Sequence, residues 1–321
     1  MPVTVEIPKE KWAGKVREIT LGATPEQGGT RAHTVTVGGE TTLPFLHFEG
    51  SIPHPPAIAL EVTSRPPEAW PGLLREVWGE AALDPATWAK AVEAQGADLI
   101  LLTLDVEDTP DLARQVVRQV MGATGLPLIV FGPGQADKDN ELLVTVAEDA
   151  KGERLVLGTC EDKNYRTIVA AALAHGHLVN ARSPMDVNLA KQLNILIHDM
   201  GLPLDRLIMD PTTGGLGYGL EYGYSVMERL RLSALAGDAM TQQPMLVSPN
   251  EEVWKAKEAK VAEGVPAAWG DLAERAVMWE TMTALALIQA GADIVVVRHP
   301  ETVRRVRLFV DRLMEGVKHE T

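Results

Sequence analysis

The sequence is poor in the groups that most metal and nucleophile chemistry needs. Its 321 residues include a single cysteine, Cys160. One thiol forms no internal disulfide and supplies only one of the four thiolates that an iron-sulfur cluster usually takes. Any iron-sulfur cluster that works with this chain is therefore expected on another polypeptide.

Positive charge and long apolar runs are also scarce. Thirty Lys and Arg stand against 44 Asp and Glu, which gives a formal charge of −14. Such a surface repels phosphate backbones and anionic lipid headgroups. No stretch approaches the ~20 uninterrupted apolar residues of a membrane span, and residues 1–10 lack the apolar core of a signal peptide. We expect a cytoplasmic protein with no nucleic-acid partner and no membrane partner.

The first 50 residues differ from the rest and predict an extension built on a β-hairpin. Apolar and polar residues alternate over 32–37, Gly38 and Gly39 allow the positive φ of a tight turn, and 40–48 form the returning strand. We place the domain boundary here, with an N-terminal extension over 1–50 and one larger domain over 51–321.

Beyond residue 50, short apolar runs alternate with longer segments of helical periodicity. The eight runs are 58–62, 99–104, 127–131, 154–158, 177–181, 206–209, 244–247 and 294–297. Continuous apolar strands need cover on both faces, and parallel sheets flanked by helices provide it. Eight such units in about 260 residues predict an α/β fold, a (β/α)8 TIM barrel. An open doubly wound sheet is the alternative, but no Gly-x-Gly-x-x-Gly follows the first run.

Helix ends are marked along the domain. Asp84-Pro85 and Thr109-Pro110 precede helical segments as a capping residue followed by a first-turn proline. Glycines stand just before five of the strands, where a helix leaves through a left-handed residue. They are Gly96, Gly152, Gly176, Gly201 and Gly291. In a closed barrel the N-terminal hairpin either plugs the amino end or adds strands to a partner's surface, and the pattern permits both.

The residues that follow each run predict where chemistry lies, because barrel sites form at the carboxyl ends of the strands. No lysine stands there, which excludes a Schiff-base aldolase. Among the histidines, only His299 follows one of the runs. One histidine supplies too few ligands for a zinc or iron centre. Cys160 has no histidine beside it and is expected to be inert. We predict no metal ligand in this chain.

The segment after the sixth run is the most unusual one. Gly214, Gly215, Gly217 and Gly219 fall within six residues. Such a backbone lies flat against a large planar or phosphate-bearing ligand, or it forms a mobile loop whose glycines only permit turns. It lacks Gly-x-x-x-x-Gly-Lys, which excludes a nucleotide P-loop.

Asn180 and Asp210 lie at neighbouring strand ends. Together they could donate and accept hydrogen bonds to a pterin ring or a corrin amide. Alternatively, each caps the helix that follows. The long connection 248–270, which carries Trp254 and Trp269, is typical of a lid or docking surface.

Several segments, in this order, resemble one family. They are KVREITLG (15–22), HTVTVGGET (33–41), LPFLHFEG (43–50), 58–62, 84–85, 96–98 and the glycine-rich loop 210–219. They are similar to the small subunit of the corrinoid iron-sulfur protein, the delta subunit of acetyl-CoA decarbonylase/synthase. The resemblance spans essentially the whole chain.

The resemblance implies a TIM barrel that forms a heterodimer with a large subunit. That large subunit holds a [4Fe-4S] cluster and most of the corrinoid (cobalamin) site. It also implies a role in the reductive acetyl-CoA pathway of carbon fixation in anaerobes. There, cobalt carries a methyl group from a methyltetrahydrofolate methyltransferase to acetyl-CoA synthase.

In this reading the barrel mouth caps the corrinoid and the cofactor carries the bond-making, which implies that this chain has no catalytic residue. The residues expected to lie over the corrin or to meet its amide side chains are Asn180, Arg182, Asp210, Thr212, Gly214, Gly215, Gly217 and Asn250. The alternative is a free-standing pterin-dependent methyltransferase of the folate-binding TIM-barrel type, motivated by Asn180 and Asp210. A third reading is a structural barrel whose mouth touches no ligand.

Overall fold

The computed structural model describes residues 7–315 and shows a barrel of eight parallel strands. The strands are β3 (Ala57–Thr63), β4 (Leu99–Thr103), β5 (Leu128–Phe131), β6 (Val156–Cys160), β7 (Leu178–Arg182), β8 (Leu207–Asp210), β9 (Leu246–Val247) and β10 (Ile294–Val297). They pair in the order β8-β7-β6-β5-β4-β3-β10-β9, and a parallel bridge between Met209 and Met245 joins the two ends. The predicted TIM barrel and its eight strands are confirmed.

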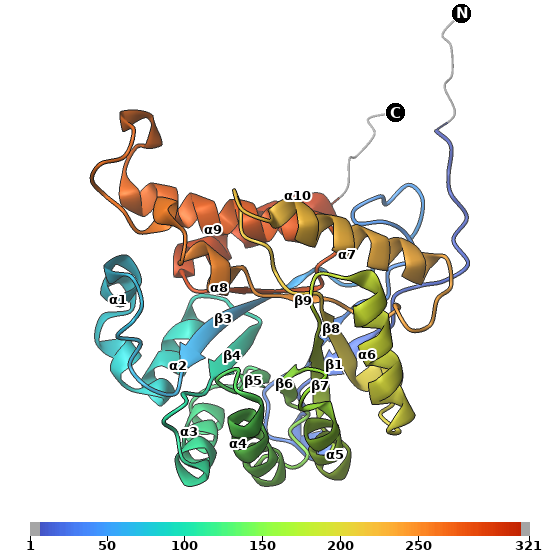
Figure 1. Ribbon diagram of the computed structural model, residues 1–321, viewed down its shortest axis with the longest axis horizontal. Helices are drawn as coiled ribbons and strands as arrows, with labels where there is room; N and C mark the ends of the chain where they lie inside the picture. Colours follow the sequence, from blue (N-terminus) through green and yellow to red (C-terminus); the bar gives the residue numbers. More distant parts are fainter. Residues whose placement is uncertain (1–6, 316–321) are drawn as a thin grey trace, which may run out of the picture.

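Helices cover the outer face of the strands (Figure 1). They are α1 (Gly72–Trp78), α2 (Pro85–Ala94), α3 (Pro110–Ala123), α4 (Ala136–Asp149), α5 (Tyr165–His175), α6 (Val187–Asp199), α7 (Leu220–Leu235), α8 (Pro249–Val253), α9 (Leu272–Gln289) and α10 (Pro300–Met314). No helix within residues 7–315 is long and apolar enough to cross a membrane. Residues 1–6 and 316–321, the outer ends of the two predicted domains, lie outside the described part.

The helix ends follow the local chemistry of the sequence. The Asp84 carboxylate accepts a hydrogen bond from the Thr87 N–H at 2.8 Å, and the Thr109 hydroxyl accepts one from the Leu112 N–H at 3.2 Å. All five glycines expected to end helices have φ between 77° and 111°. These side-chain and backbone preferences act over three or four residues, so the sequence alone predicts them.

The barrel lumen is filled by the inward-facing residues of the strands, since successive side chains point to opposite faces. Its apolar part includes Ala59, Leu101, Leu178 and Val296, and a short two-stranded sheet packs into the same cluster. That sheet pairs β1 (Ile19–Leu21) with β2 (Val35–Val37) in antiparallel fashion. Its buried side chains Ile19, Leu21 and Val37 belong to the lumen cluster. The N-terminal sheet therefore plugs the apolar end of the barrel.

The N-terminal antiparallel pair is confirmed, with a different pairing from the one expected. The strand β2 pairs with the earlier β1, so Gly38 and Gly39 are not the hairpin turn and 40–48 form bends instead of a strand. Gly38 packs so closely that an added Cβ would lie 2.0 Å from the Arg17 carbonyl oxygen. Both glycines are needed for close approach and positive φ, but the turn they make leads toward the barrel.

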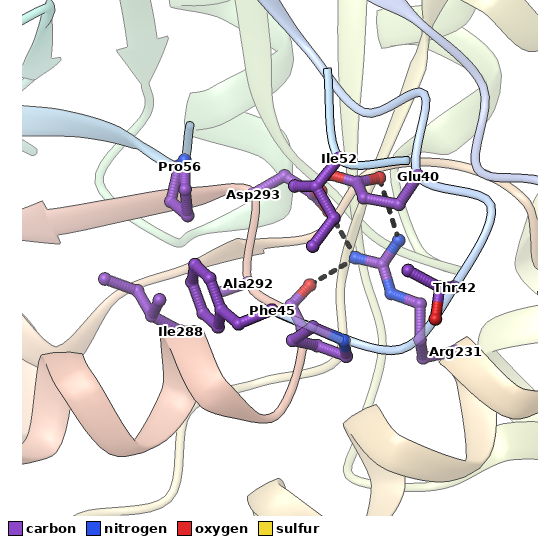
Figure 2. Close-up of a pocket in the computed structure, with 11 residues that line it drawn as sticks. Glu40, Thr42, Phe45, Ile52, Pro56, Arg231, Ile288, Ala292 and Asp293 are labelled. Atoms are coloured by element: carbon purple, nitrogen blue, oxygen red, sulfur yellow. Dashed lines mark hydrogen bonds and ion pairs between the residues drawn. The ribbon is translucent and has the colours of Figure 1, made fainter. Parts of the chain in front are cut away.

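A buried ion cluster fastens the extension to the barrel (Figure 2). Arg231 of α7, 3% exposed, contacts the Glu40 carboxylate at 3.3 Å and the Asp293 carboxylate at 2.8 Å. Burial, and then the charge of Asp293, raises the pKa of Glu40 to about 8 despite Arg231. The folded protein thus holds a proton on Glu40 at neutral pH.

We expect the free energy of unfolding to fall as the pH rises through the neutral range. Above the ordinary pKa of about 4.5 the unfolded chain has lost the Glu40 proton, while the folded chain keeps it up to about pH 8. Each pH unit in that window lowers the stability by up to about 1.4 kcal/mol. Buried His177 and His299, with pKa values lowered to about 4, lose their stabilising effect below pH 6.5. Urea titrations between pH 6.5 and 8 avoid the histidines, and a Glu40 variant is needed to assign the decline because burial also raises the pKa of Glu280.

The matched variant is Glu40→Gln. It should flatten the decline between pH 6.5 and 8, which amounts to about 2 kcal/mol in the wild type. A decline of the same size in both proteins would contradict the protonated state of Glu40.

Candidate functional site at the barrel mouth

A polar layer closes the carboxyl end of the lumen. Every second side chain along a strand points into the lumen. Each member of this layer therefore lies two residues after an apolar residue that fills the lumen. They are Glu61 after Ala59, Thr103 after Leu101, Asn180 after Leu178, Asp210 after Ile208, and Arg298 after Val296. The lumen is thus apolar where the N-terminal sheet plugs it and polar at the mouth.

One half of the mouth is organised around Arg182, the last residue of β7. Its Nε donates to the Asp210 carboxylate at 2.7 Å and its Nη2 to the Glu251 carboxylate at 3.1 Å. The Thr212 N–H donates to the other Asp210 oxygen at 3.0 Å. Burial alone would lower the pKa of Arg182, but Asp210 and Glu251 raise it above its ordinary value. Three of the predicted site residues therefore form one cluster: Arg182, Asp210 and Thr212.

The other half is organised around Glu61, a fully enclosed carboxylate within β3. One oxygen accepts hydrogen bonds from Asn250 Nδ2 at 2.6 Å and Arg298 Nε at 2.5 Å. The other accepts from the Thr103 hydroxyl at 2.9 Å. Burial opposes ionisation, yet Arg298 and these hydrogen bonds hold the pKa of Glu61 below its ordinary value. Asn250 joins this second cluster, apart from the Arg182 cluster.

Sequence reasoning missed Glu61 because it lies inside an apolar run and not after it. The available signal was a lone carboxylate in a strand buried on both faces, which requires a partner. The partner Arg298 follows β10 and lies 4.5 Å above the ring of Trp70.

Glu280 of α9 is a second residue that sequence reasoning missed. It is fully buried and accepts hydrogen bonds from four donors. They are Trp254 Nε1 at 2.7 Å, the Arg298 N–H at 2.8 Å, the His299 N–H at 3.1 Å and the Thr302 hydroxyl at 2.7 Å. This carboxylate thus joins the connection after α8 to the start of α10, which sets the position of Arg298.

The connection expected to form a lid or docking surface has a mixed structure. Trp254 is 2% exposed and belongs to the core, whereas Trp269 is half-buried beside the Arg275 guanidinium. Between them are 3₁₀ helices at Lys257–Ala259 and Ala267–Trp269. The segment between α8 and α9 projects from the barrel (orange, upper left in Figure 1).

The glycine-rich loop forms a closed turn at the rim. Tyr218 N–H and Leu220 N–H both donate to the Gly215 carbonyl, at 3.0 and 2.9 Å. Gly214 is packed inside, since an added Cβ would meet the Gly219 carbonyl oxygen at 2.0 Å. Gly217 is exposed with φ of 80°, and the Tyr218 side chain is 92% exposed. The outer face of this loop therefore offers backbone and one free aromatic ring.

Two side-chain amides at the mouth have atoms without a hydrogen-bond partner among the described residues. Both the oxygen and the nitrogen of Asn180 are buried without a hydrogen bond, and so is Asn250 Oδ1. Neither Asn180 nor Asp210 caps the next helix, because α6 begins at an Asp186 cap and α7 at Gly219. Orphaned buried amides usually mark a bound water or ligand.

These groups fit a ligand held by hydrogen bonds at its periphery. Within residues 7–315 no group of three or more His, Cys, Asp or Glu side chains could hold a metal ion. Cys160 lies inside β6, where burial raises the pKa of its thiol.

Comparison with known proteins shows which family this chain is similar to. The model of the CO dehydrogenase/acetyl-CoA synthase delta subunit matches residues 18–310. The acetyl-CoA decarbonylase/synthase complex subunit delta of Archaeoglobus fulgidus is 40% identical over 309 residues, 92% of this chain and 68% of the relative. Its counterpart in Methanopyrus kandleri is 37% identical over 312 residues, 94% and 76% of the two chains.

Solved structures with the same barrel include dihydropteroate synthases. That of Xanthomonas albilineans superposes with a TM-score of 0.57 at 16% identity and covers 80% of this chain and 93% of its own. That of Thermus thermophilus gives 0.53 at 18% identity, with 85% and 98% covered. At these identities the likeness concerns the fold.

Proposed function

The chain belongs to the CO dehydrogenase/acetyl-CoA synthase delta subunit family, and from that premise we propose that its barrel mouth caps a corrinoid held mainly by a second, larger subunit. Family members are subunits of a larger complex, so other subunits are its partners. We further propose that the pair carries a methyl group between a methyltetrahydrofolate methyltransferase and acetyl-CoA synthase in the reductive acetyl-CoA pathway. The [4Fe-4S] cluster is assigned to the larger subunit.

When bound, the corrinoid supplies the cobalt that accepts and releases the methyl group. The chain's own residues position and shield it. Arg182, fixed by two carboxylates, keeps a rigid charged edge at the mouth. Thr212 is held by Asp210, and Gly217, further along the same loop, is exposed. The exposed backbone of Gly217 would let a flat macrocycle approach the loop next to the protruding Tyr218 ring, and the covered face would then exclude water.

The observation that carries this proposal is the outward face of the loop 212–219, which lies next to the Arg182 cluster. We expect valine at Gly217, the exposed glycine of the loop, to slow methyl transfer in the reconstituted pair about 10- to 100-fold, because the added side chain holds the macrocycle away from the rim. The measurement is the single-turnover transfer rate. Unchanged rates would support a barrel whose mouth touches no ligand.

The control for backbone strain is Gly201→Val. Gly201 also has a positive φ, 94°, and an added Cβ meets no atom within 4 Å. It lies between α6 and β8, at the end of the barrel opposite the mouth, so the same strain there should leave methyl transfer unchanged.

The alternative, a free-standing pterin-dependent methyltransferase, rests on the shared dihydropteroate synthase barrel and on Asn180 and Asp210. Two observations weigh against it. The Asp210 carboxylate is already engaged by Arg182 and Thr212, and Asn180 has no exposed surface. The purified chain alone should therefore show no saturable micromolar binding of methyltetrahydrofolate. Saturable binding without a partner would favour the alternative.

A further inference from the structure

The segment between α8 and α9, which projects from the barrel in Figure 1, is closed at its base by one side chain. Arg275, near the start of α9, donates from Nε to the Glu258 carbonyl at 2.7 Å and from Nη2 to the Val261 carbonyl at 2.6 Å. Its Nη1 donates to the Gly270 carbonyl at 3.0 Å, and its guanidinium lies 5.5 Å from the centre of the Trp269 ring. Arg275 is 9% exposed and thus binds both ends of the loop.

We call residues 261–269 of this loop the knob. Its sequence, VAEGVPAAW, is small and apolar apart from Glu263. Every residue from 262 to 268 except Val265 is exposed. A contiguous apolar group on a projecting element is typical of a contact with another protein. Because Arg275 already holds the loop in one shape, a partner would not bear the cost of ordering it.

The contacts at the base favour a docking element over a lid, the two roles that the sequence left open. A lid opens by changing the backbone at its ends, and both ends of this loop are bound to Arg275. Opening would leave a buried guanidinium without its carbonyl partners. The 3₁₀ helix that precedes the knob is also anchored, since Ala259 is 1% exposed. The knob therefore stays extended from the barrel, where another protein can reach it.

The charges beside the knob indicate what surrounds it in a complex. Lys257 and Lys260 are exposed, while Glu258 between them is half-buried. Of the three lysines in this segment only Lys255 has an ion partner among the described residues, Glu252 at 3.0 Å. Two exposed cations next to an apolar tip are matched by a surface that is apolar at its centre and acidic at its border on this side.

The position of the knob indicates which protein it contacts. It follows α8, whose Asn250 and Glu251 are bonded to the Glu61 and Arg182 clusters of the mouth. A subunit that covers the mouth therefore borders on this segment. We propose that the knob inserts into an apolar pocket of the larger subunit, with acidic side chains of that subunit facing Lys257 and Lys260. This inference rests on the proposed function and names the element of this chain that holds the partner.

The test measures the binding of the full-length chain to the larger subunit by calorimetry. Ala267→Asp should raise the Kd at least tenfold, because an apolar pocket would bury an unpaired carboxylate. The matched control is Ala94→Asp, which places the same charge on an exposed alanine at the end of α2 and should leave the Kd unchanged. Both alanines are exposed, so neither change should unfold the chain.

A second variant tests the acidic border. Lys257→Glu combined with Lys260→Glu should slow association about fivefold or more at low salt, and the difference from the wild type should shrink as the salt concentration rises. An unchanged association rate would contradict acidic groups opposite these lysines.

The outcomes separate this inference from the proposed function. If Ala267→Asp binds the larger subunit as tightly as the wild type does, the knob contact is wrong, and a pair that retains corrinoid still supports the capping role. If Ala267→Asp weakens binding but the wild-type pair retains no corrinoid, the knob contact stands and the capping role fails. A wild-type chain that does not bind the larger subunit would overturn both.

Discussion

Replacing Arg231 by methionine is expected to lower the free energy of unfolding by about 3–5 kcal/mol. The guanidinium is 3% exposed and contacts the carboxyl groups of Glu40, in the extension, and of Asp293, just before β10. Removing one partner of a buried ion cluster leaves charge in a medium that solvates it poorly. The Asp293 carboxylate would lose its guanidinium, and Glu40 would lose the contact that ties the extension to α7.

Equilibrium urea unfolding of the isolated chain measures this effect. The control is Arg118→Met, which breaks a surface ion pair with Asp149. Arg118 is 63% exposed, so this change should cost less than about 1 kcal/mol. Equal costs for the two variants would show that the Arg231 cluster does not fasten the extension.

Replacing Glu280 by alanine is expected to cost at least about 4 kcal/mol of stability. Four donors lose their acceptor, and each buried unsatisfied group costs about 1–3 kcal/mol. Two of the donors are the backbone N–H groups of Arg298 and His299 at the start of α10. The loss therefore also frees Arg298, which holds Glu61 and lies over Trp70.

Glu280→Gln is the informative companion. It keeps the shape and one acceptor oxygen, so we expect about half the cost of the alanine variant. Guanidinium titrations compare the two, and crystallography of the glutamine variant locates Arg298. A cost below about 1 kcal/mol for alanine would contradict the role of Glu280 as the acceptor that holds the rim together.

Features that depend on a few neighbouring residues were predictable from the sequence. The eight apolar runs became strands, and the Asp84 and Thr109 caps and the five helix-ending glycines act within one turn. The pairing of β2 with β1 was not predictable from the turn signal at Gly38-Gly39. It depends on burying Ile19 and Leu21 in a lumen built by strands far along the chain.

The candidate site was also predictable only in part. The rule that barrel sites form at strand ends located Arg182, Asp210 and Thr212, which the structure brings together. It did not locate Glu61, whose burial is balanced by Arg298, 237 positions later in the chain. Nor did it separate the loop glycines, since only the fold shows Gly214 packed inside and Gly217 facing outward. Contacts between distant segments decide whether such residues are buried or exposed, and the hydrophobic periodicity of the sequence does not predict those contacts.

Amide hydrogen exchange of the reconstituted pair, with and without corrinoid, tests the capping role most directly. The corrinoid should slow exchange at the rim, over residues 182–189 and 212–219, and leave the N-terminal sheet at the opposite end unchanged. A pair that binds corrinoid while both rim segments exchange at the same rate as in the corrinoid-free pair would contradict a barrel mouth that covers the cofactor.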